Sequence, residues 1–189
     1  MQKKRDYKKM MGWFIVITMV LSIVGFVGTE FFANRAAAGP ANEYNGYSLK
    51  NQFGKWNIEV RGQTITFTYS PEELENITLP VDIIPWLAMG KVYLGYLPDD
   101  HLQVNSQIQF IGSVLYQNGI IFQQACTIEA GCPDIPLLDC TVKEGIILVS
   151  GDQTVMRADN KCLVLQAIDE ADMQKLAERV AYQFLGVMR

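Results

Sequence analysis

Residues 56–69, "WNIEVRGQTITFTY", decide the fold class that this sequence predicts. Apolar and polar residues alternate in "WNIEV", before the turn at "RGQ", and alternate again in "TITFTY" after it. Such alternation, rich in β-branched and aromatic side chains, is typical of half-buried β-strands. The stretch therefore predicts two strands joined by a turn, each with one face in a core.

The residues that follow predict a short helix and a further strand. In "SPEELENI" (70–77), Ser70 suits the capping position, Pro71 the first helical position, and Glu73 the residue that completes a capping box. Residues 81–90, "VDIIPWLAMG", are ambiguous because a proline interrupts any long element. "KVYLGYL" (91–97) again has the composition of a strand.

Two dipeptides predict β-hairpins in the middle of the chain. Asn118-Gly119 lies between "SVLYQ" and "IIFQQ", which is typical of a type I′ turn. Gly151-Asp152 lies between "GIILVS" and "QTVMR", which is consistent with a type II′ turn. We therefore expect antiparallel strands on both sides of each dipeptide.

The spacing of apolar residues changes near the C-terminus. In "DEADMQKLAERVAYQFLG" (169–186) they recur at intervals of three and four, as on one face of an amphipathic helix. Asp169 suits the cap, and Gly186 follows the last apolar position. Strands followed by this helix predict an α+β fold: a mostly antiparallel β-sheet domain with a C-terminal amphipathic helix packed on one face.

The N-terminal part of the chain predicts a membrane anchor. Residues 1–9, "MQKKRDYKK", form a basic tail, and the next twenty residues carry no charge. Twenty helical residues span about 30 Å, the thickness of the hydrocarbon core of a bilayer. With the aromatic residues just beyond this run included, we place a transmembrane helix at 10–32 and a linker at 33–46.

The charges on either side of this helix predict its orientation. The positive-inside rule keeps the basic tail in the cytoplasm, so the domain at 47–189 is extracytoplasmic and the chain is a single-pass protein of the cell membrane. Cleavage after Ala38, at the signal-peptide-like "AAA", is the alternative, and it exports the domain as well.

The exported part of the chain is acidic. Residues 39–189 contain ten Lys or Arg against eighteen Asp or Glu, a net charge of −8. This charge repels phosphate backbones, so we expect no nucleic-acid partner. The expected partners are the membrane, through the N-terminal helix, and other envelope or membrane proteins.

The four cysteines indicate disulfide bonds rather than a metal or redox site. They form no C-x-x-C pair and lack the close spacing of zinc ligands. An even number of cysteines in an exported domain favours disulfides, with reduced buried thiols as the alternative. The residues concerned are Cys126, Cys132, Cys140 and Cys162.

The predicted hairpin around residues 151–152 favours one pairing of these cysteines out of three. In that hairpin position 140 would face position 163, which brings Cys140 and Cys162 within one residue of each other. We therefore predict a Cys140–Cys162 bond and, as the remaining pair, a Cys126–Cys132 bond.

Few residues are candidates for chemistry. Asp99, Asp100 and the only histidine, His101, could act as acids or bases, but neither a nucleophile arrangement nor a nucleotide-binding loop accompanies them. "NIT" (76–78) is a sequon that makes Asn76 a candidate N-glycosylation site. We expect no cofactor, no metal and no catalytic residue.

Several stretches, in this order behind an N-terminal anchor, resemble a group of small single-pass membrane proteins of archaeal genomes. They are "NGYSLKNQFGKWNIEVRGQTITFTYSPEELENI" (45–77), "LLDC" (137–140), "NKCLVLQA" (160–167) and "AERVAYQFLGVM" (177–188). The resemblance implies a shared fold and the pairing of Cys140 with Cys162, but no activity or cofactor. Cys126 and Cys132 depart from the pattern of this group.

These features together predict a membrane-anchored extracytoplasmic accessory or binding domain without catalytic activity. The alternatives are a structural component of a cell-envelope assembly and an exported enzyme that uses Asp99 and Asp100.

Overall fold

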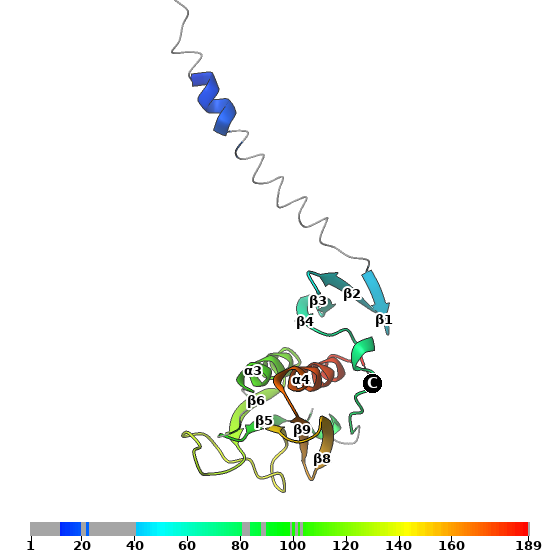
Figure 1. Cartoon of the computed structure of the whole chain (residues 1–189), viewed down its shortest axis with the longest axis vertical. Helices are drawn as coiled ribbons and strands as arrows, with labels where there is room; N and C mark the ends of the chain where they lie inside the picture. Colours follow the sequence, from blue (N-terminus) through cyan, green and yellow to red (C-terminus); the bar gives the residue numbers. More distant parts are fainter. Residues whose placement is uncertain are drawn as a thin grey trace, which may run out of the picture.

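The domain is built of three layers (Figure 1). The computed structural model describes residues 12–19, 22, 41–80, 84–87, 90–98, 100, 102 and 104–188. Two helices lie between an antiparallel sheet of four strands and a second sheet of five strands. The predicted α+β class, with an antiparallel sheet and a C-terminal helix, is confirmed.

The first sheet is an antiparallel meander whose strands follow one another in the sequence. Its strands are β1 (Ala41–Tyr44), β2 (Tyr47–Gln52), β3 (Lys55–Val60) and β4 (Gln63–Phe67). The two strands predicted at 56–69 are β3 and β4, and Ile58 lies opposite Ile65. β1 lies within the segment 33–46 that we predicted to be a linker, so the sheet begins earlier than expected.

The second sheet is mainly parallel, which the sequence did not predict. Its order is β6-β5-β7-β9-β8, and only the β8–β9 pair is antiparallel. The strands are β5 (Lys91–Tyr96), β6 (Ile121–Cys126), β7 (Gly145–Ser150), β8 (Val155–Asp159) and β9 (Cys162–Ala167). A parallel sheet needs both faces covered, and here helices cover one face and a disulfide-bonded loop the other.

The predicted hairpin at Asn118-Gly119 is wrong, because a helix precedes this dipeptide. α3 (Asn105–Gln117) includes the residues expected to form the first strand of that hairpin. Gly119 has a φ of 78°, and the N–H of Ile120 donates to the carbonyl of Leu115 at 2.9 Å. This is the Schellman motif that ends many helices, and it uses the same Asn-Gly signal as a type I′ turn.

The predicted hairpin at Gly151-Asp152 is also wrong. β7 runs parallel to β9, and β8 pairs with β9 rather than with β7. The two-residue turn that closes a hairpin here is Asn160-Lys161, between β8 and β9. β7 and β9 are largely buried along their length, as is typical of inner parallel strands.

The local capping signals are confirmed. The N–H of Ser70 donates to Glu73 Oε2 at 2.7 Å, and the N–H of Glu73 donates to Ser70 Oγ at 3.3 Å. This capping box begins a single 3₁₀ turn, η1 (Glu72–Leu74). α4 (Glu170–Phe184) begins with Asp169 as its cap, whose side chain accepts the N–H of Asp172 at 2.8 Å. The short helix α2 (Ile84–Leu87) precedes β5.

α3 and α4 are buried on two sides. Toward the second sheet they pack on the even-numbered residues of β5 and β7, such as Leu94 and Ile146. Toward the first sheet they pack on Ile58, Ile65 and Phe67. Alternate residues of each strand face the same way, which explains why the apolar positions of the meander alternate.

Leu138 of the disulfide-bonded loop packs on the opposite face of the second sheet. It lies over Gly95 and Gly145 of neighbouring strands, where a Cβ atom would come within 2.8 Å and 2.7 Å of its Cδ2. At Gly145 the Cβ atom would also lie 2.9 Å from the backbone carbonyl oxygen of Tyr93, so a shift of Leu138 alone would not make room for it.

Most of the predicted anchor at 10–32 lies outside the described residues. Residues 12–19 and 22 are described, and they are helical. Among the described residues, no helix has the length and apolar character needed to cross a membrane. The basic tail at 1–9 and the alternative cleavage site at Ala38 also lie outside the described residues.

We expect one substitution in the turn between β2 and β3 to stabilise the domain. Phe53 has a φ of 53° and is 89% exposed, so its side chain gains little from packing in this turn. Asparagine tolerates the left-handed conformation better, so we expect Phe53→Asn to raise the free energy of unfolding by about 1 kcal/mol. Denaturant unfolding of the full chain in detergent measures this change. Alanine in the left-handed conformation carries the same cost as phenylalanine, so Phe53→Ala should leave the free energy of unfolding nearly unchanged. A gain equal to that of Phe53→Asn would contradict this explanation.

Candidate functional site

Two separate hollows lie beside β4 and α3, and we treat them together as one candidate site. β4 is the last strand of the meander, and two hollows lie between its edge and α3. Residues near the end of β4 meet the beginning of α3 in one hollow, and residues near the start of β4 meet the end of α3 in the other. Strand and helix therefore run antiparallel along the two sides of this site, which we call the β4–α3 groove.

The larger hollow has a volume of about 270 Å³ and lies at the beginning of α3. The smaller hollow, with a volume of only about 10 Å³, lies beside the β3–β4 turn and the end of α3 and is lined in part by Arg61, Gln63 and Gln117. The larger hollow is lined by Lys55, Thr66, Phe67, Thr68, Ser106, Gln107, Phe110, Gln174, Ala177 and Glu178.

Glu178 of α4 holds the end of β4 in place. It is 3% exposed, and its carboxylate accepts the backbone N–H of Thr68 at 2.9 Å and that of Tyr69 at 2.8 Å. Gln174 Nε2 also donates to Glu178 Oε1, at 3.0 Å. Both carboxylate oxygens are thus occupied, which compensates for the loss of hydration on burial.

Two aromatic residues, Phe67 and Phe110, line the larger hollow, and Phe67 packs on Tyr182 beneath it. The ring of Phe67 lies 4.0 Å from that of Tyr182 in a stacked arrangement and 5.6 Å from that of Phe110 edge to face. The Tyr182 hydroxyl donates to the carbonyl of Tyr69 at 2.8 Å, and burial raises the pKa of this phenol. Because these rings come from β4, α3 and α4, they fix the groove walls relative to one another.

Two hydrogen-bond donors in the larger hollow are available to a ligand. Gln107 is 9% exposed; its Oε1 accepts the Ser106 hydroxyl at 2.8 Å, but its Nε2 has no partner among the described residues. No fully enclosed polar side-chain atom in the described part of the chain lacks a partner, so Nε2 is not fully enclosed, and Gln107 is one of the residues that line the hollow. Within the described residues, Lys55 Nζ donates only to Thr68 Oγ1, at 2.9 Å, and it supplies a positive charge.

The structure pairs the cysteines as predicted, although not for the predicted reason. The Cα atoms of Cys140 and Cys162 are 5.3 Å apart, and those of Cys126 and Cys132 are 6.0 Å apart. Cys162 begins β9, which runs parallel to β7, and Gly145 is its neighbour in the ladder. The bond therefore joins the loop before β7 to the start of β9, not the two open ends of a hairpin.

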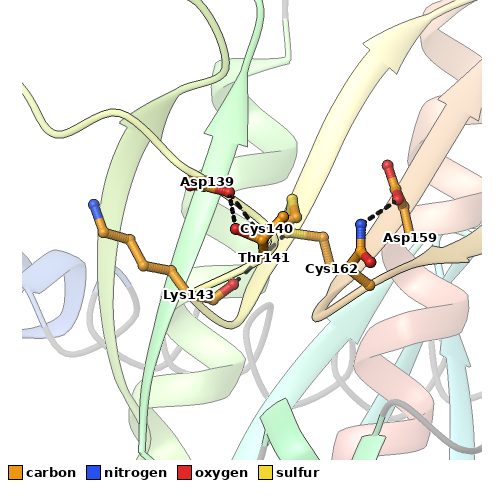
Figure 2. Close-up of a disulfide and its surroundings, with 7 residues drawn as sticks. Asp139, Cys140, Thr141, Lys143, Asp159 and Cys162 are labelled. Atoms are coloured by element: carbon orange, nitrogen blue, oxygen red, sulfur yellow. Dashed lines mark hydrogen bonds between the residues drawn. A yellow bond between two sulfur atoms is a disulfide. The ribbon is translucent and has the colours of Figure 1, made fainter.

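Figure 2 shows the surroundings of the Cys140–Cys162 bond. Asp139 precedes it and accepts the Thr141 hydroxyl at 2.7 Å and its N–H at 2.9 Å. These two hydrogen bonds lower the pKa of the Asp139 carboxyl group. The groups around this disulfide hold a turn together, and none of them lies in the β4–α3 groove.

The candidates for acid–base chemistry are not brought together in the described structure. Asp99 and His101 lie outside the described residues. Asp100 accepts the N–H of Leu102 at 3.1 Å and that of Ser150 at 2.6 Å, which ties the end of β5 to the end of β7. In the described part of the chain, no cluster of three or more His, Cys, Asp or Glu could hold a metal ion.

Asn76 is exposed and follows η1. A hollow beside it is lined by residues 76–78, Pro80, residues 154–156 and Leu176. The sequon is therefore accessible on the surface, and its use remains a prediction.

Sequence reasoning missed the residues of the groove. Gln107 belongs to a helix that was not predicted, and the sequence analysis assigned no role to Glu178. One feature of the sequence did indicate a second packing surface: the apolar residues of α4 cover so broad an arc of the helix that burial on two sides is expected.

Comparison of the chain with protein-family models, with curated proteins and with solved structures finds no match.

Proposed function

We propose that this chain is a membrane-anchored extracytoplasmic binding domain without catalytic activity, and that the β4–α3 groove is its binding surface. The observation that carries the proposal is that Gln107 lines the larger hollow and that its donor Nε2 has no partner among the described residues. A ligand oxygen that accepts this hydrogen bond would be held at a defined position in the larger hollow.

Two features support export and anchoring. The two disulfides favour an oxidising compartment. The uncharged run behind the basic tail is long enough for a transmembrane helix, and its flanking charges favour a cytoplasmic N-terminus. A tether of this kind keeps the groove close to the membrane surface, where it can bind another envelope or membrane protein.

Peptide mapping of the full-length chain from membranes, with and without reduction, tests the location. We expect linked peptides that carry Cys140 with Cys162 and Cys126 with Cys132, together with an intact N-terminal peptide. Four free thiols would place the domain in a reducing compartment and contradict export. Loss of the first 38 residues would contradict anchoring alone.

Photocrosslinking in the native cell tests the binding surface. A photoreactive amino acid replaces Gln117, which lines the smaller hollow, and in a matched variant replaces Val142, which is 63% exposed in the disulfide-bonded loop away from the groove. We expect a discrete protein adduct from position 117 and none from position 142. Equal adducts at both positions, or no adduct at 117, would contradict the proposed surface.

A further inference from the structure

The free edge of β4 presents backbone groups at defined positions. The two-residue turn at Arg61-Gly62 makes Val60 and Gln63 the first hydrogen-bonded pair between β3 and β4. The same pattern turns the N–H and C=O groups of Thr64 and Thr66 away from β3. An edge of this kind can pair with a further strand.

The sequence of β4 does not protect this edge. "QTITF" contains no charged residue and no proline, the residues that commonly prevent pairing at an edge. β1, at the other edge of the same sheet, carries Glu43. α3 lies beside β4 without pairing to it, and the two hollows lie between strand and helix.

The exposed charged groups at the two hollows favour an acidic occupant. Lys55 lies at the larger hollow and Arg61 at the smaller one, and both are exposed. The buried carboxylate of Glu178 is already satisfied by three donors. Gln107 Nε2, in the larger hollow, adds a donor that a carboxylate can accept from.

We propose that the β4–α3 groove binds an extended acidic segment of a partner protein, which adds to β4 as a fifth strand of the meander. The backbone of the segment pairs with Thr64 and Thr66, and an acidic side chain reaches Lys55 and Gln107. Main-chain pairing at a sheet edge beside a helix is a known way to recognise extended peptides, with side-chain contacts supplying the specificity. This inference rests on the proposed function.

Two other occupants are disfavoured by the arrangement of the sheet. The N-terminal segment of this chain enters the domain at β1, the opposite edge of the meander. A second copy could pair β4 with β4, but this would bring Lys55 and Arg61 of each copy toward like charges of the other. Dimerisation is therefore an outcome to be tested.

A proline at the open edge provides the most specific test. The N–H of Thr66 points away from β3, so Thr66→Pro removes an outward donor without breaking the ladder within the sheet. Glu43→Pro is the matched control, because the N–H of Glu43 points outward from β1 in the same way. Gln107→Leu removes the unpartnered donor and leaves β4 unchanged.

The experiment selects random dodecapeptides displayed on phage against the full chain in detergent micelles. Enriched peptides are then synthesised and measured by fluorescence anisotropy. We expect them to be acidic and free of proline, and to bind at least about tenfold more weakly to the Thr66→Pro and Gln107→Leu chains but not to the Glu43→Pro chain. N-methylation of alternate peptide nitrogens should weaken binding similarly, and this readout needs no protein variant.

The outcomes separate this inference from the proposed function. If neither Thr66→Pro nor N-methylation changes the affinity of the enriched peptides, strand addition is overturned. Adducts from position 117 would in that case still support the groove as a binding surface. Selection of basic peptides would overturn the acidic partner. A chain that dimerises through an edge sensitive to Thr66→Pro would identify a second copy as the occupant and overturn the proposal.

Discussion

Replacing Glu178 by alanine is expected to lower the free energy of unfolding by about 3–4 kcal/mol. The substitution leaves the N–H groups of Thr68 and Tyr69, as well as Nε2 of Gln174, without their common acceptor. Because Glu178 is 3% exposed, water does not readily replace the carboxylate. For a domain of this size the loss corresponds to a fall of about 10 °C in Tm.

Thermal unfolding of the full chain in detergent, followed by near-UV circular dichroism, measures this effect. Glu178→Gln keeps one acceptor oxygen and should cost about half as much, since its amide group faces one of the two N–H donors. Glu170→Ala is the matched control, because Glu170 lies exposed in the first turn of the same helix and should cost at most about 0.5 kcal/mol. Equal losses at positions 170 and 178 would show that the carboxylate network does not hold the end of β4.

Removing the Cys140–Cys162 bond by the double substitution Cys140→Ala and Cys162→Ala is expected to cost about 3 kcal/mol. The bond closes a loop over a sequence separation of 22 residues, and the chain-entropy model relates the stabilisation to the length of that loop. Alanine is the suitable replacement, because Cys162 is fully buried and a serine hydroxyl there would add a desolvation cost.

The second disulfide provides the internal comparison for this experiment. Cys126 and Cys132 have a sequence separation of 6, so the double alanine variant at these positions should lose only about 2 kcal/mol. Denaturant unfolding of both variants and of the unmodified chain gives the order of the two losses. A larger loss from the short loop would contradict loop closure as the main source of stabilisation.

The features that the sequence predicted correctly depend on neighbouring residues. The capping box at Ser70, the cap at Asp169 and the end of α4 before Gly186 each involve groups within a few residues of one another. The β3–β4 pair is similar, because its two-residue turn sets the register of strands that follow each other directly. Local hydrogen bonding and a period of two residues are sufficient to predict these elements.

The two wrong hairpins come from turn signals with more than one structural meaning. Asn-Gly suits a type I′ turn, but it equally suits the end of a helix, and Ile108, Ile111 and Leu115 already had helical spacing. "GIILVS" and "CLVLQA" are nearly continuous apolar runs, as expected for strands with both faces covered. The disulfide prediction survived the error, because both arrangements bring Cys162 close to the start of β7.

By itself, the sequence determined the α+β class, the β3–β4 hairpin, the closing helix and the use of the four cysteines in disulfides. Only the tertiary structure decided the direction of β7 relative to β9, the burial of α3 and α4 between two sheets, and the existence of the β4–α3 groove. In that groove Thr68 meets Glu178 across 110 residues. Such contacts depend on which faces bury each other when the layers pack, and the periodicity of a single segment carries no information about the partner of its apolar face.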